Sequence, residues 1–303
     1  MAVATGMATA ALGTDTGGSI RIPASLCGIV GFKPTYGRVS LRGVFPLSWN
    51  LDHAGPLTRC VTDAAILLQV IAGYDEDDPH CADVPVDDYV RHLEDGAGGL
   101  RIAVAGGTYT EGSDSEVLEA LDNAAELFRH LGATVTKVIP EFLRNAALAN
   151  GQMTQADAAT YHRDRLSEHP EMFGADVRRR LEAGRDLSVA DYALARLTQS
   201  ETRRRLGRLF GEFDVLMLPA TPIPAPLIDN GDAVELARQL TRFTAPFNLA
   251  GFPAISIPCG FTRTGLPIGL QLVAPPWCEA RLLQAARAYE REVDWGSRHP
   301  DGV

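Results

Sequence analysis

Residues Gly13 to Arg21 read Gly-Thr-Asp-Thr-Gly-Gly-Ser-Ile-Arg, and they carry the strongest chemical signal in this chain of 303 residues. Gly17 and Gly18 let the backbone approach a ligand closely and adopt φ values that aim successive N–H groups inward. Ser19 follows them directly and could attack a carbonyl carbon. The amides of Thr16, of both glycines and of the serine itself could then stabilise the resulting oxyanion, an interaction worth about 3 kcal/mol per donor.

The same stretch does not fit the better-known serine motifs. Asp15 and Arg21 could brace the loop by pairing, but Arg21 stands where the second glycine of a Gly-x-Ser-x-Gly motif belongs. No Ser-x-x-Lys sequence occurs in the chain. An isolated Gly-Gly-Ser is most often only a turn. The surrounding sequence therefore has to discriminate between a structural and a catalytic interpretation.

Five segments in and beyond this loop match one family. They are Ala10–Ala24, Gly31–Thr35, Leu51–Arg59, Pro246–Ala254 and Gly265–Gln271. Together they closely resemble the amidase signature, and the resemblance covers essentially the whole chain. It implies an α/β fold with a mixed central β-sheet flanked by helices, here lacking its N-terminal part. We expect no cofactor and no bound metal.

The resemblance also assigns roles to individual residues. Enzymes of this family hydrolyse amides with a Ser-Ser-Lys triad, in which a lysine is the base, one serine relays the proton and a second serine attacks the amide. Ser19 matches the attacking serine. Thr16, Gly17 and Gly18, together with the N–H of Ser19, match the loop whose amides form the oxyanion hole. Asp15, with Arg21 of the same motif, is expected to give structural support.

The other two members of that triad are expected ahead of Ala2–Gly6. The relay serine belongs to a Gly-Gly-Ser-Ser-Gly-Gly stretch that should precede this segment, and the base lysine lies further upstream. The chain has only two lysines, Lys33 and Lys137, and neither occupies the base position. Because an unactivated serine hydroxyl is a weak nucleophile, we expect a truncated form that is inactive on its own.

Two functions within the family compete, and a third belongs to another class. A free-standing amidase would act on a small or aryl carboxamide, whereas the A subunit of a glutamyl-tRNA(Gln) amidotransferase would release ammonia from glutamine. That glutaminase is expected to carry an aspartate shortly before Pro246, and Arg238–Ala245 contains none. This absence favours the free-standing amidase. The third hypothesis is a non-catalytic, degenerate fragment of the fold.

The composition indicates a globular protein and restricts its partners. The formal charge of -10, from 38 acidic against 28 basic residues, disfavours binding to nucleic acid or to an anionic membrane. Five widely spaced cysteines suit reduced thiols in a cytoplasm. The scattered histidines and the absence of a phosphate-loop or dinucleotide motif argue against a metal or nucleotide site. The expected partner is a small-molecule amide, and a homodimer is one option for the assembly.

Strands mixed with helices along the chain predict an α/β protein. The resemblance implies a single amidase-signature domain over residues 1–303. The signature core covers about residues 1–80 and a variable helical region about residues 144–213. Small residues predict a packed helix over Met1–Gly13, and Ile20–Pro34 reads as short apolar pieces separated by turns. The remaining pattern predicts helices over 62–73, 115–131 and 279–291, and strands over 100–105, 134–139, 215–218, 254–258 and 268–273.

Overall fold

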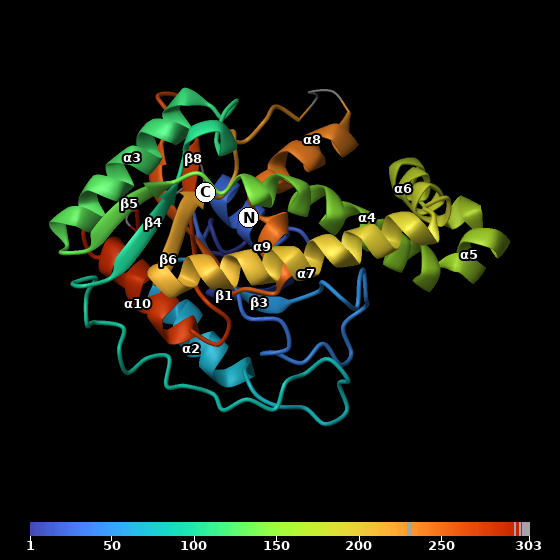
Figure 1. The fold of residues 1–303 in the computed structure, drawn as a ribbon, viewed down its shortest axis with the longest axis horizontal. Helices are drawn as coiled ribbons and strands as arrows, with labels where there is room; N and C mark the ends of the chain where they lie inside the picture. The colour runs from blue at the N-terminus through green and yellow to red at the C-terminus, as the bar shows by residue number, and fades with distance from the viewer. Residues whose placement is uncertain (229–231, 294, 297, 299–303) are drawn as a thin grey trace.

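The computed structural model describes residues 1–228, 232–293, 295, 296 and 298, and in this part of the chain a central sheet lies between helices (Figure 1). The sheet has eight described strands in the order β1-β3-β2-β7-β8-β6-β4-β5. Their bounds are β1 Ala10–Thr14, β2 Val30–Lys33, β3 Ala54–Thr58, β4 Arg101–Ala105, β5 Thr134–Val138, β6 Val215–Pro219, β7 Ala254–Phe261 and β8 Pro267–Val273.

The sheet is mixed, as predicted. Strand β4 runs parallel to both β5 and β6, with Ile102 opposite Val135 and Val215. The other pairs, β1–β3, β2–β3, β2–β7, β7–β8 and β6–β8, are antiparallel. The predicted β-α-β unit is confirmed, because helix α3 (Ser115–His130) connects the parallel strands β4 and β5.

Two helical layers cover the sheet. One layer contains α2 (Val61–Ile71), α3 and α10 (Glu279–Glu290), and the other contains α1 (Arg21–Cys27), α7 (Val189–Glu212) and α9 (Ala245–Ala250). Successive side chains of β6 point alternately into the two layers. Its Val215 and Met217 belong to the first core, whereas Leu216 and Leu218 belong to the second, as expected for a strand buried on both faces.

The region of residues 144–213 is helical, as predicted, and in Figure 1 much of it extends to one side of the sheet. It holds α4 (Arg144–Tyr161), α5 (Arg163–Glu168), α6 (Ala175–Arg185) and α7, while α8 (Ala233–Leu240) follows later in the chain. The break between α6 and α7 ends at Ser188, whose side chain forms a capping box with Asp191. Helix α4 packs against α7 and α9, which brings this region against the signature core.

The helix predicted over Met1–Gly13 is wrong. A single turn, closed by the Thr5 N–H on the Met1 carbonyl at 3.0 Å, stops at Gly6 with φ +75°. Strand β1 follows and pairs with β3, with Ala10 opposite Thr58. Alanine favours helix only by local propensity, and tertiary pairing overrides such a weak preference.

Two further elements near the N-terminus differ from the expectation of short pieces and turns. The stretch Ile20–Pro34 contains a full helix, α1, and a strand, β2. Helix α1 ends at Gly28 in the left-handed conformation, with φ +66°. Strand β3 had no signal in the sequence either, because Gly55 and Pro56 within it argue against a strand.

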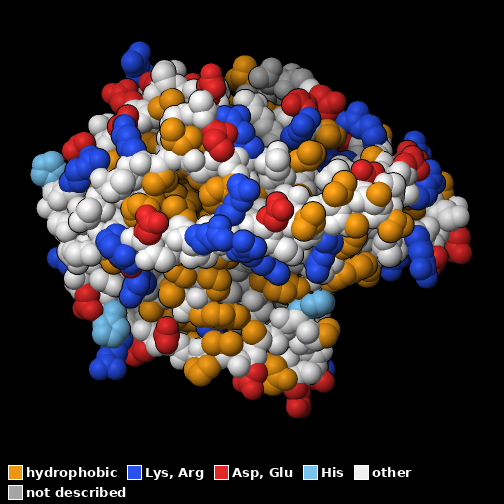
Figure 2. All heavy atoms as spheres, in the orientation of Figure 1, with side chains coloured by type: hydrophobic (Ala, Val, Ile, Leu, Met, Phe, Trp, Pro, Cys, Tyr) orange, Lys and Arg blue, Asp and Glu red, His pale blue; other side chains and the backbone are white. Residues whose placement is uncertain are grey.

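Three consecutive arginines of α7 lie at the surface of the molecule. Arg203, Arg204 and Arg205 of α7 are exposed, and a band of blue side chains lies over this helix in Figure 2. Among the described residues, no helix combines the length and the apolar character that a membrane span requires.

Helix α1 lies unusually close to the sheet because glycines face it. A Cβ added to Gly31 of β2 would come within 2.6 Å of Ala24 Cβ, and one added to Gly269 of β8 would come within 2.9 Å of the Ser25 Cα. Any larger residue at either position would therefore push α1 outward. Because the Ser19 loop leads directly into α1, this close packing also fixes the height of the loop above the sheet.

We predict that Gly269→Ala destabilises the fold by about 1–3 kcal/mol, since overpacking a well-filled site forces the backbone to shift. Urea unfolding followed by circular dichroism measures this change. Gly260→Ala is the matched control, because its Cβ would meet Ala120 Cβ at 3.6 Å, an ordinary contact. Equal stabilities of the two variants would contradict the role assigned to Gly269.

Candidate active site

The loop from Asp15 to Ile20 connects β1 to α1 and presents one hydroxyl to solvent. Asp15, Thr16 and Gly18 are buried, Gly17 is half-buried, and Ser19 is exposed. Gly18 adopts φ +141°, which side-chain-bearing residues rarely adopt, and a Cβ there would overlap Thr244 Oγ1. The second glycine of the motif is therefore required by both backbone conformation and space.

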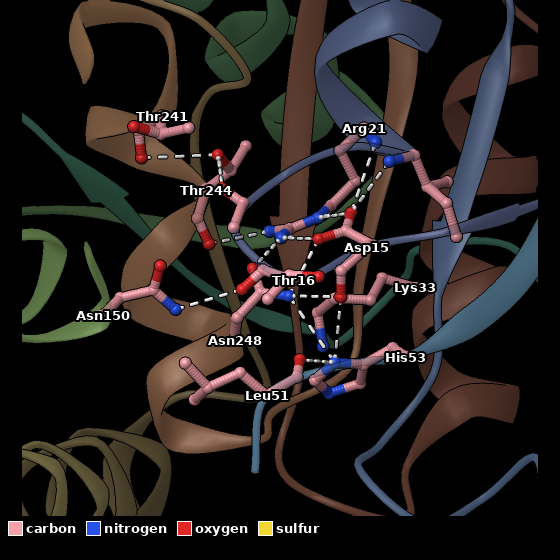
Figure 3. Close-up of polar contacts among 12 residues, drawn as sticks. Asp15, Thr16, Arg21, Lys33, Leu51, His53, Asn150, Thr241, Thr244 and Asn248 are labelled. Carbon is pink, nitrogen blue, oxygen red and sulfur yellow. Dashed lines mark hydrogen bonds and ion pairs between the residues drawn. The ribbon is translucent and has the colours of Figure 1, made fainter. Parts of the chain in front are cut away.

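A buried ion pair holds this loop in place (Figure 3). The Arg21 Nε and Nη2 groups donate to the two carboxylate oxygens of Asp15, both at 3.0 Å. Nη2 also donates to Asn248 Oδ1 at 2.5 Å, and Nη1 donates to Gln271 Oε1 at 2.6 Å and to the Thr244 carbonyl at 3.0 Å. All five N–H groups of the guanidinium are thus satisfied. The predicted supporting residues do pair, and they link the loop to α9 and β8.

The charge on Asp15 is stabilised by its surroundings. Burial by itself would raise the pKa of Asp15, but the Arg21 guanidinium, assisted by Lys33 and the Asn248 amide, outweighs it and holds this pKa well below its usual range. Because the pKa is depressed in the folded state, the pair stabilises the fold fully above about pH 4, where an unfolded aspartate is ionised. That stabilisation is lost as the pH falls further, towards the pKa of the folded state.

Four consecutive backbone N–H groups of the loop, those of residues 16–19, donate to no acceptor within the described part of the chain. The groups on either side are occupied. Asp15 N donates to the His53 carbonyl at 2.8 Å, and Ile20 N donates to the Asp15 carboxylate at 3.1 Å. Unpaired N–H groups in a partly buried loop are uncommon and make a ready anion-binding site.

The Asp52 carboxylate lies beside the loop and accepts three hydrogen bonds from the protein. Asp52 Oδ1 accepts from the Thr16 hydroxyl at 2.5 Å, and Oδ2 accepts from the N–H groups of Leu47 and Ser48 at 2.8 and 3.1 Å. Asp52 also borders a cavity of about 170 Å³. The cavity is lined by Leu41, Arg42, Val44, Pro46, Trp49, Asp52, Asp77, Asp78, Pro79 and His80.

Lys33, a buried basic residue, donates its hydrogen bonds to backbone carbonyls and not to Ser19. Lys33 Nζ donates to the carbonyls of Phe252 and Pro34 at 2.6 and 3.1 Å. Burial lowers its pKa well below the usual range, with the Arg21 charge acting in the same direction. The Ser19 hydroxyl has no hydrogen-bond partner among the residues that the structure describes.

His53 and Arg59, both in a segment of the signature, brace the structure. His53 Nδ1 lies 2.7 Å from the Leu51 carbonyl, so this nitrogen carries the proton, and burial lowers the histidine pKa well below its usual range. Its Nε2 is buried without a partner in the described part of the chain. Arg59 donates to the Ala4 carbonyl at 2.7 Å. No group of three or more potential metal ligands occurs within the described ranges.

Four polar residues that contact the loop or its ion pair had no predicted role. Asn248 and Gln271 lie in segments that resemble the signature, but sequence offers no way to pair them with Arg21. Thr244 and Asn150 contact the carbonyls of Gly17 and Thr16, and Asn150 comes from the variable helical region. No local pattern distinguishes that asparagine from others on a polar helix.

We predict that Arg21→Met destabilises the protein by about 3–5 kcal/mol, because it leaves the Asp15 carboxylate buried without its partner. Urea unfolding at neutral pH measures the loss. The control is Arg101→Met, which removes an exposed pair with Asp214 and should cost about 1 kcal/mol or less. Adding Asp15→Leu to Arg21→Met should recover part of the stability. If Arg21→Met alone is no less stable than Arg101→Met, the ion pair between Asp15 and Arg21 does not have the stabilising role assigned to it.

Comparison with known proteins places these features in one family. The amidase family model matches residues 1–283. An amidase of Pseudomonas putida is 39% identical over 299 residues, which cover 96% of this chain and 64% of that protein. The A subunit of the glutamyl-tRNA(Gln) amidotransferase of Geotalea daltonii is 40% identical over 322 residues, covering 98% of this chain and 66% of the relative.

Solved structures agree with the sequence relatives. The crystal structure of the glutamyl-tRNA(Gln) amidotransferase A subunit from Thermotoga maritima superposes with a TM-score of 0.86 at 34% identity, over 99% of this chain and 66% of that one. The chain therefore spans about two thirds of the length of the proteins it matches. The sequence match, the sheet topology and the clamped Ser19 loop agree: this chain belongs to the amidase family.

Proposed function

We propose that Ser19 is the nucleophile of an amide hydrolase. The observation that carries the proposal is the exposed Ser19 hydroxyl beside four backbone N–H groups, those of residues 16–19, that have no acceptor within the described part of the chain. When the Ser19 oxygen bonds to the carbonyl carbon of an amide, the carbonyl oxygen becomes an oxyanion. Preorganised N–H donors stabilise that charge more than they stabilise the neutral substrate.

The reaction then follows the course of serine acyl transfer. The Ser19 proton passes to a base, the tetrahedral intermediate collapses, and the C–N bond breaks as the leaving amine takes up a proton. Water hydrolyses the resulting ester and regenerates the hydroxyl. In this scheme Thr16, Gly17 and Gly18 supply oxyanion N–H groups together with Ser19, and Asp15 with Arg21 keeps them aligned.

Removal of the Ser19 hydroxyl proton limits the rate that the described residues achieve on their own. Neither Lys33 nor His53 reaches the Ser19 hydroxyl, since both are held by backbone carbonyls. Lys137 is exposed and pairs with Asp122 at 3.0 Å. We therefore propose that the 303-residue chain by itself attacks strongly activated carbonyls and hydrolyses ordinary amides only slowly.

A small or aryl carboxamide is the substrate class that we favour. Residues 238–245 contain no carboxylate to hold the ammonium group of glutamine. Two carboxylates that line the neighbouring cavity are occupied: Asp77 pairs with Arg42 at 2.5 Å, and Asp78 accepts from the Leu41 N–H at 2.7 Å. The similarity to the Pseudomonas putida amidase supports the same choice. Glutamine is the alternative, supported by the similarity to the A subunits of amidotransferases.

We predict that 4-nitrophenyl acetate is hydrolysed by the purified chain and that Ser19→Ala lowers this rate by about 100-fold or more, because the attacking oxygen is removed. Release of 4-nitrophenol measures the rate, and a fluorophosphonate probe followed by mass spectrometry locates the reacting serine. Ser200→Ala, an exposed change on α7, is the control and should retain the full rate. Unchanged hydrolysis by Ser19→Ala, together with no probe label on Ser19 of the unmodified chain, would favour the hypothesis of a non-catalytic fragment.

Substrate choice has a separate test. We expect turnover of benzamide or an anilide to exceed that of glutamine by about tenfold or more, because an ammonium group without a partner is costly to desolvate. Ammonia or aniline release measures both reactions under the same conditions. Faster Ser19-dependent turnover of glutamine would select the glutaminase alternative and leave the role of Ser19 intact.

A further inference from the structure

Four backbone carbonyl oxygens of the Ser19 loop have hydrogen-bond donors, although the N–H groups of residues 16–19 have no acceptor within the described part of the chain. Each of the four carbonyls from Asp15 to Gly18 accepts a hydrogen bond. The donors are Asn248 Nδ2 to the Asp15 oxygen at 2.8 Å, Asn150 Nδ2 to the Thr16 oxygen at 3.0 Å, Thr244 Oγ1 to the Gly17 oxygen at 2.6 Å, and Ile22 N to the Gly18 oxygen at 2.7 Å.

This division has a geometric consequence. A trans peptide unit is planar, and its C=O and N–H bonds point in opposite directions. The Thr16 carbonyl shares a peptide unit with the Gly17 N–H, and the Gly17 carbonyl shares one with the Gly18 N–H. A donor placed on either oxygen therefore aims the paired N–H towards the opposite side of the loop.

We infer that Asn150 and Thr244 are positioning residues, which set the direction of the Gly17 and Gly18 N–H groups in the oxyanion hole. The inference rests on the proposed function, because it gives these two N–H groups their purpose. Neither side chain touches the reacting atoms. Each acts through one peptide unit of the loop.

The loop needs such restraint because its Gly-Gly sequence restricts the backbone dihedral angles very little. A glycine pair has the widest choice of φ and ψ of any dipeptide, so a peptide unit between two glycines can rotate unless its oxygen is held. The unit joining Gly17 to Gly18 is of this kind, and Thr244 holds it. Thr244 is fully buried and is the N-cap residue of α9, and the Arg21 guanidinium donates to the Thr244 carbonyl.

The side-chain amide of Asn150 makes one hydrogen bond within the described part of the chain. Asn150 is 4% exposed, lies on α4, and its side chain donates only to the Thr16 carbonyl (Figure 3). Its Oδ1 also lies 3.1 Å from the position of a Cβ built on Gly17. A buried amide normally satisfies several donors and acceptors, and this one is directed at a single carbonyl of the loop.

The expected effect is selective for tetrahedral ligands. Removing one oxyanion donor costs about 10²–10³ in rate, and a misdirected donor loses part of this contribution. Phenylboronic acid is a suitable probe because its boron bonds to a serine oxygen and becomes tetrahedral, which places an anionic oxygen where the oxyanion would lie. Benzamide stays planar and reports on ordinary binding.

The test uses the full 303-residue chain with Thr244→Val, Thr244→Ser and Asn150→Leu. Calorimetric titration with phenylboronic acid gives the affinity, boron NMR identifies the tetrahedral adduct, and Ser19→Ala shows whether the adduct is on Ser19. Thr198→Val is the matched control, because its hydroxyl donates to the Leu194 carbonyl within α7. Thermal melting establishes that each variant is folded.

We expect Thr244→Val and Asn150→Leu to bind phenylboronic acid about tenfold or more weakly, with benzamide affinity unchanged within about twofold. Thr244→Ser, which keeps the hydroxyl, should restore boronate affinity. The two variants lie on different elements, so either one that folds is decisive.

Two outcomes would overturn the inference in distinguishable ways. Boronate affinity equal to wild type in a folded Thr244→Val or Asn150→Leu variant, with the adduct still on Ser19, overturns the positioning role of that residue and leaves the proposed function intact. The absence of any Ser19-dependent tetrahedral adduct in the wild-type chain overturns the proposed function and the positioning role together.

Discussion

The buried ion pair between Asp15 and Arg21 is the interaction on which the rest of the site depends. It closes a loop of a few residues, and its guanidinium also donates to Asn248, which is 227 residues away in the chain. Burying two charges is costly, and good geometry with complete hydrogen bonding is what offsets the cost. Here every N–H of the guanidinium has an acceptor, so the loop, α9 and β8 are joined at one point.

This arrangement gives the carbonyl oxygens and the N–H groups of the loop different surroundings. The carbonyl oxygens face donors from the protein interior, while the neighbouring N–H groups remain without acceptors in the described structure. Three of the four carbonyls are held from outside the loop, by Asn150 on α4, by Thr244 at the start of α9 and by Asn248 on α9.

Close packing provides the second constraint. Glycines at positions 31 and 269 let α1 approach the sheet, and Gly18 leaves room for the Thr244 hydroxyl. These glycines therefore serve different physical purposes. The first two are needed for space alone, whereas Gly18 is needed for both space and its φ value. The same close contacts leave no room for a larger side chain at any of the three positions.

The sequence by itself determined the family, the mixed α/β sheet, most of the later helices and strands, and the pairing of Asp15 with Arg21, because these follow from short-range patterns and a long specific motif. It did not determine the first strand, where alanine propensity yielded to pairing with β3. It also did not identify Asn150 and Thr244, because a polar side chain on a helix carries no local sign of its distant partner. Only the tertiary structure, which brings α4 and α9 to the loop, decided which carbonyls accept hydrogen bonds and which N–H groups have no acceptor among the described residues.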